Sequence, residues 1–213
     1  MSELSFLTDG PADATDRFVL AHGAGAPMDS PTMEAIATEV AAAGIRVVRF
    51  EFPYMRQRRS SGRRRPPDRQ PVLLETWHEV IDALGGAERL VIGGRSMGGR
   101  MASLIADAVG ARGLVCLGYP FHPPGNPEKL RTEHLAALHT PTLIVQGERD
   151  AFGSKAEVGG YALSNAIRVH WLADGDHSFV PRKRSGHTTA DHLAEAAAVT
   201  AGFIRSLGHA TRS

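Results

Sequence analysis

Short apolar runs alternate with segments of helical periodicity along most of the 213-residue chain. Each run is continuous, rich in β-branched or aromatic residues, and followed by glycine or polar residues, as buried strands are. The expected strands are residues 18–21, 45–52, 90–92, 113–117, 142–145 and 167–172. Strands that alternate with helices form mostly parallel sheets with helices on both faces. The sequence therefore predicts an α/β fold with a central, mostly parallel sheet.

The segments between these runs have the signals of helices. Ser30 and Pro31 are typical of a helix start, and Gly44 is typical of the position just after a helix end. Apolar residues recur at helical spacing in residues 71–84 and 188–207. Further helices are expected at residues 97–109, 130–138 and 154–163.

Composition sets limits on the class of protein. Hydrophobic residues make up 42% of the chain, which suffices for a full core, and we expect one domain over residues 1–213. The net charge of +1 gives no reason to expect a nucleic-acid partner. Residues 1–10 do not resemble a secretory signal, and no apolar run is long enough for a membrane span. With Cys116 as the single cysteine, we expect a cytoplasmic protein.

A Gly-x-Ser-x-Gly motif, Gly94 to Gly98, lies between an expected strand and an expected helix. In that context the serine occupies a tight turn that projects its hydroxyl above the sheet. Ser96 is therefore the candidate nucleophile. Its alternative role is that of a helix-capping serine in a glycine-rich turn.

A serine nucleophile on such a turn needs an acid and then a histidine, in that chain order. Asp150 and His177 follow the next strands in that order, and we expect them to be the acid and the base. Loops at the carboxyl ends of parallel strands meet at one edge of the sheet. The less favoured candidates are Glu148 for the acid, Asp174 and Asp176 as turn residues, and Asp191, His187 and His192 as surface groups.

Glycines follow the first strong strand in the sequence His22-Gly23-Ala24-Gly25. The loop at this position supplies one backbone N–H to an oxyanion, and the residue after the serine supplies the other. We therefore expect Ala24 and Met97 to form an oxyanion hole. His22 itself is expected to be a structural, hydrogen-bonded histidine.

The segment between the strands at 113–117 and 142–145 is short. It leaves no room for a lid domain, so we expect an open site. Tyr119, Phe121 and His122 are expected to form one wall of that site, although loop packing is an equal alternative for Phe121. No spacing typical of a metal site or a nucleotide-binding loop occurs, so no metal and no cofactor is expected.

Residues 53–71 read as a loop by composition and contain a cluster of arginines. These are Arg56, Arg58, Arg59, Arg63, Arg64, Arg65 and Arg69. One hypothesis is that they attract anionic substrates, such as acyl groups on phosphate-bearing carriers. The alternative is a solvated, mobile loop.

Taken together, the motifs at residues 22–31, 94–100, 118–125, 146–153 and 176–179 resemble a known family. They resemble small bacterial α/β-hydrolases, often described as dienelactone-hydrolase-like, that are related to a testis-expressed protein and to a chromatin-complex subunit. The resemblance covers nearly the whole chain and implies the α/β-hydrolase fold with Ser96, Asp150 and His177 as its triad. True dienelactone hydrolases have a cysteine where this chain has Ser96.

The expected function is hydrolysis of a small-molecule carboxylic ester or thioester through an acyl-enzyme on Ser96. Two alternatives remain open at this stage: a non-catalytic protein-interaction module on the same fold, and a small serine peptidase.

Overall fold

A computed structural model describes residues 4–208 of the chain, so the ends of the expected domain, residues 1–3 and 209–213, lie outside it. Its strands form one seven-stranded sheet in the order β1-β3-β2-β4-β5-β6-β7. All neighbouring strands are parallel except β1 and β3. The strands are β1 (Phe6–Asp9), β2 (Arg17–Ala21), β3 (Arg46–Phe50), β4 (Leu90–Arg95), β5 (Gly113–Leu117), β6 (Thr142–Gly147) and β7 (Ile167–Leu172). The predicted mostly parallel sheet is confirmed.

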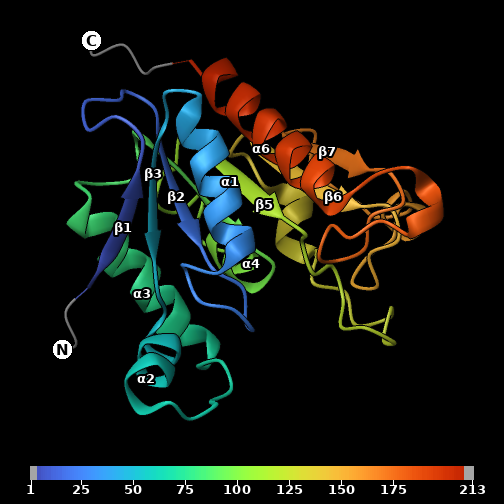
Figure 1. The fold of residues 1–213 in the computed structure, drawn as a ribbon, viewed down its shortest axis with the longest axis horizontal. Coiled ribbons are helices and arrows are strands. Elements are labelled where there is room, and N and C mark those ends of the chain that lie inside the picture. Colours follow the sequence, from blue (N-terminus) through green and yellow to red (C-terminus); the bar gives the residue numbers. More distant parts are fainter. Residues whose placement is uncertain (1–3, 209–213) are drawn as a thin grey trace.

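Helices cover both faces of this sheet (Figure 1). They are α1 (Pro31–Ala42), α2 (Pro53–Ser61), α3 (Gln70–Ala83), α4 (Met97–Ser103), α5 (Lys155–Val158) and α6 (Thr189–Ser206). On one face, α1 and α6 lie side by side over apolar residues such as Leu20 and Val115. On the other face, α3 and α4 cover Val19 and Ile92. Alternate residues of each strand thus enter different cores, because successive strand side chains point to opposite faces.

The segment at residues 53–71 differs from its prediction as a loop. Its first half is the helix α2, and only residues 62–69 are irregular. Pro53 occupies the first turn, where proline is well tolerated, and arginine is a good helix former. Gly62 adopts a left-handed φ of 66° after the last turn and so ends α2.

Other boundaries also differ. The edge strand β1 was not expected, and α4 and α5 are shorter than the predicted helices at 97–109 and 154–163. The helix expected at 130–138 is a 3₁₀ helix, Glu133–Ala137. Residues 118–141 otherwise contain turns and irregular chain, so no lid domain is inserted there, as predicted.

Candidate active site

Ser96 lies at the turn between β4 and α4 in a strained backbone conformation. Its φ is 48° and its ψ is −112°, a region that costs free energy for any residue with a Cβ. Neighbouring chain approaches so closely that flanking side chains cannot fit. A Cβ on Gly94 would lie 2.5 Å from the Ala21 carbonyl oxygen, and one on Gly98 would lie 2.5 Å from that of His22. The glycines of the motif are therefore required by packing.

The three predicted triad residues meet at the carboxyl edge of the sheet. The His177 Nε2 lies 2.9 Å from the Ser96 Oγ, and the His177 Nδ1 lies 2.7 Å from the Asp150 Oδ2. Asp150 is fully buried, while about a fifth of the His177 side chain is exposed. With Asp150 as a carboxylate, Nδ1 carries the proton and Nε2 is free to accept the serine proton.

Asp150 is held by two further donors. The Gln146 Nε2 donates to its Oδ2 over 2.9 Å, and the Phe152 N–H donates to its Oδ1 over 2.8 Å. Gln146 is completely buried and also bonds the Tyr119 backbone. The sequence analysis missed Gln146, and its position in β6, four residues before the acid, was the available signal.

Arg95 connects this site to the loop that carries His177. Its guanidinium donates to the carbonyl oxygens of Leu117 and His177. It also lies 4.7 Å from the centre of the Phe179 ring. Burial lowers the pKa of Arg95 to about 10, against the opposing attraction of Asp150 and Asp176, so the side chain stays charged at neutral pH.

Hydrogen bonds from within the loop and from α6 hold the loop that carries His177. The Asp176 Oδ1 accepts hydrogen bonds from the Ser178 and Val180 N–H groups, which makes Asp176 a turn residue as predicted. The His192 Nδ1 donates to the Phe179 carbonyl oxygen over 2.9 Å. The expectation that His192 is a surface group is wrong, because its side chain is fully buried beneath this loop.

Three of the less favoured acids, Asp174, Glu148 and Asp191, have partners other than His177. Asp174 pairs with Arg149 and Arg182, and Glu148 pairs with Lys155. Asp191 closes the first turn of α6 in a capping box with Thr188. These carboxylates therefore have structural partners of their own.

Burial also indicates the roles of the His22 and Cys116 side chains. The His22 Nε2 accepts a hydrogen bond from the Phe52 N–H, and its Nδ1 donates to the Gly23 carbonyl oxygen. Burial lowers the pKa of His22, consistent with this neutral form and with the expected structural role. Cys116 is buried in β5, and burial raises the pKa of its thiol, which makes it a poor nucleophile.

A cavity of about 560 Å³ opens beside Ser96. The loop of residues 23–26 forms one side of it, and Phe152, His177 and Ser178 form another. Ala24 is among the lining residues. Met97 is the first residue of α4, where backbone N–H groups lack partners within the helix.

The prediction that Tyr119, Phe121 and His122 form one wall of the site is wrong. Their exposed fractions are 0, 0 and 2%, and none of them lines the cavity. The Tyr119 hydroxyl donates to the Arg131 carbonyl oxygen, and the Phe121 ring packs on the Tyr119 ring. The aromatic side chain at the site is Phe152, whose ring centre lies 4.2 Å from that of His177.

Residues 14–205 match a family described as an alpha/beta hydrolase domain. The chain belongs to the α/β-hydrolase family. It is thus a hydrolase of the α/β fold, and the predicted resemblance is confirmed at this level. Among residues 4–208, no helix is long and apolar enough to cross a membrane, and no group of three or more potential ligand side chains could hold a metal ion.

Solved structures of similar fold cover almost the whole chain. A dienelactone hydrolase from Anabaena variabilis has a TM-score of 0.71 and 20% identity, over 96% of this chain and 92% of that one. A serine hydrolase without a lid from Xanthomonas campestris has a TM-score of 0.69 and 19% identity, over 98% and 91%. Est1E from Butyrivibrio proteoclasticus, solved with ferulic acid, has a TM-score of 0.70 and 14% identity, over 96% and 95%. At these identities the likeness shows the shared fold.

Proposed function

We propose that this chain is a serine hydrolase that cleaves a carboxylic ester or thioester through an acyl-enzyme on Ser96. The continuous hydrogen-bonded chain from Asp150 through His177 to Ser96 carries the proposal. Both bonds fall within the range of a working nucleophile and base. The strained backbone of Ser96 adds support, because such strain concentrates at functional sites.

The reaction has two halves. His177 takes the proton of the Ser96 hydroxyl as its oxygen attacks the carbonyl carbon, and then gives that proton to the departing alcohol or thiol. A water molecule, deprotonated by His177, next attacks the acyl-enzyme and releases the acid. Asp150 keeps the imidazole in the required tautomer and stabilises its charged form.

The negative charge that develops on the carbonyl oxygen needs fixed donors. We assign this role to the N–H groups of Met97 and Ala24. Met97 begins α4, so its N–H also lies at the positive end of the helix dipole. Ala24 belongs to the loop that borders the same cavity. Removal of one such donor typically costs about 100-fold or more in kcat.

The preference for an ester or thioester is tested with matched compounds. Hydrolysis of an ester, a thioester and an amide that share one short acyl group should be measured for the wild type and Ser96→Ala. We expect turnover of the ester or the thioester by the wild type, little on the amide, and a loss of several orders of magnitude in the variant. Equal turnover by both proteins would contradict the proposal, and turnover of the amide alone would favour a peptidase.

The cytoplasmic location expected from the single cysteine stays a prediction.

A further inference from the structure

Part of the arginine-rich segment lines a cavity that the proposed reaction does not use. This cavity of about 300 Å³ lies between α2 and the chain that follows it. Four arginines form its polar lining, and Pro27 and Met55 contribute an apolar part. The arginines are Arg58, Arg59, Arg63 and Arg64.

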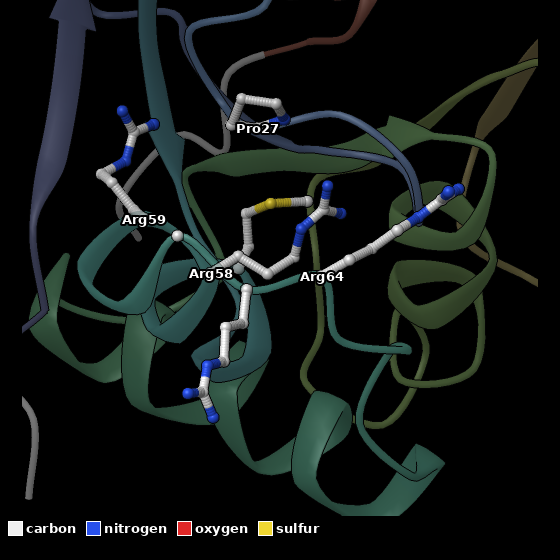
Figure 2. A pocket seen from close by; sticks show the side chains of 7 residues that line it. Pro27, Arg58, Arg59 and Arg64 are labelled. Atoms are coloured by element: carbon white, nitrogen blue, oxygen red, sulfur yellow. The ribbon is translucent and has the colours of Figure 1, made fainter.

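One of the four arginines, Arg59, already has carboxylate partners that balance its charge. Arg59 binds Glu51 over 2.6 Å and Asp29 over 2.7 Å, and these bonds raise its pKa above the usual value. Figure 2 shows the Arg59 side chain extending to the left and those of Arg58 and Arg64 extending to the right. Arg59 is therefore a structural residue that fixes α2 to the sheet.

The other three arginines lack a counter-charge. Within residues 4–208, Arg58, Arg63 and Arg64 form no ion pair. The one hydrogen bond that their side chains make there runs from the Arg58 Nη1 to the Gly25 carbonyl oxygen over 3.4 Å. Figure 2 shows the Arg58 and Arg64 side chains extending to the same side, and two like charges on one cavity repel each other. An anion there would remove this repulsion, and guanidinium groups match the oxygens of phosphate with paired hydrogen bonds.

The arginine cavity and the cavity at Ser96 share a loop. Residues 23–26 line the cavity beside Ser96, and Pro27, the next residue, lines the arginine cavity. Arg58 bonds the middle of this loop at Gly25. Gly23 and Gly25 are separated by at most about 7 Å of chain. A Cβ placed on Gly23 would lie 3.7 Å from the Ser96 Cβ, so an extended substrate that follows residues 23–25 can reach from Ser96 to Arg58.

We propose that Arg58 and Arg64 bind a phosphate group on the leaving part of the substrate while Ser96 attacks its acyl carbonyl. This inference rests on the proposed function and narrows it to acyl esters or thioesters of phosphorylated alcohols or thiols. The acyl group occupies the cavity beside Ser96, and the phosphate lies across the loop of residues 23–27.

The test compares two thioesters that differ only in the phosphate. Hydrolysis of acetyl-pantetheine and acetyl-4′-phosphopantetheine is to be measured for the wild type, for Arg58→Gln/Arg64→Gln and for Arg64→Gln alone. The Arg64 side chain makes no hydrogen bond within residues 4–208, so its replacement should leave the fold intact. The matched control is Arg17→Gln/Arg89→Gln, which removes two exposed charges from the opposite edge of the sheet. We expect kcat/KM to favour the phosphorylated thioester by at least about tenfold in the wild type and the control. That ratio should fall in Arg64→Gln and approach one in the double variant.

A wild-type ratio near one, or the same ratio in all variants, would overturn the phosphate site and leave the serine hydrolase standing. If neither thioester is cleaved, thioester hydrolysis fails, and binding decides the phosphate site separately. Calorimetric titration with inorganic pyrophosphate should then show binding to the wild type and the control, and loss of binding in Arg58→Gln/Arg64→Gln. Equal binding to all proteins, or none, would overturn the inference.

Discussion

At the scale of single residues, Arg95 links the serine turn to the histidine loop. Its guanidinium reaches the backbone carbonyl oxygens of Leu117 and His177 together, and it covers the Phe179 ring. Because the bond is to the His177 backbone, Arg95 acts on the imidazole through the loop that carries it. We therefore propose that Arg95 is a positioning residue.

Replacing Arg95 by lysine tests this role. The ammonium group of Arg95→Lys keeps the charge but cannot span both carbonyl oxygens as the planar fork does. We expect kcat on a neutral ester to fall by about tenfold or more with little change in KM, because a small misplacement of a catalytic group slows the chemical step. Thermal unfolding of the variant checks that the fold is intact. An unchanged kcat in a folded variant would show that the loop needs no such support.

The residues of the candidate site divide into those that the sequence could predict and those that it could not. Ser96 and His177 are 81 positions apart, yet both follow parallel strands, and such loops share one sheet edge. Gln146, Arg95 and Phe152 were not predicted, because their partners are loop atoms whose positions depend on how each loop turns. For Gln146 the sequence offered one signal, its place in β6 four residues before Asp150. The same cause explains Tyr119. It follows Gly118, whose φ is 69°, and the chain then turns into the core.

At the scale of elements, periodicity was informative where a segment packs on the sheet. The helix expected at 188–207 is α6, with Thr188 as its cap, and β7 has the predicted bounds. The helix α2 was missed because its polar sequence has almost no apolar stripe, and only Tyr54 and Met55 are buried. The strand β1 has four residues and lies at the edge, so its pattern is too short to separate from a loop.

A hydrogen-bonded clamp at Asp107 joins the segment after α4 to residues 139–140, just before β6. The Asp107 Oδ1 accepts from the Thr140 N–H and hydroxyl over 2.7 and 2.6 Å, and the Oδ2 accepts from the His139 N–H over 3.0 Å. Burial would raise the pKa of Asp107, but these hydrogen bonds outweigh it and lower the pKa to about 2. The clamp thus stabilises the folded chain when Asp107 is ionised.

The stability contributed by Asp107 should depend on pH. Its folded pKa lies below its unfolded value of about 3.9, so the contribution is complete above that value and is lost as the pH falls toward 2. We expect Asp107→Asn to lower the free energy of unfolding at pH 7 by about 1 kcal/mol, and by less at pH 3. Urea unfolding at both pH values measures this difference. Asp82→Asn, an exposed change on α3, is the control. A difference that stays constant with pH would contradict the role of the ionised clamp.

At the scale of the whole molecule, one sheet brings the functional loops to one edge. The turn at Ser96, the loops of Asp150 and His177, and the loop after β2 all follow parallel strands. The two apolar cores hold this sheet from both sides, and we propose that residues 1–213 form one domain around it. No lid domain is inserted between β5 and β6, so we expect the loops around the site to determine the choice of substrate.

The central claim is that Ser96 is an activated nucleophile. Intact-mass measurement after reaction with a fluorophosphonate probe, on the wild type and Ser96→Ala side by side, tests it most directly. We predict that the wild type gains the mass of one phosphonyl group and that Ser96→Ala gains none, because only a serine polarised by His177 and Asp150 attacks the probe. Absence of labelling in a folded wild type, or equal labelling of both proteins, would contradict the account.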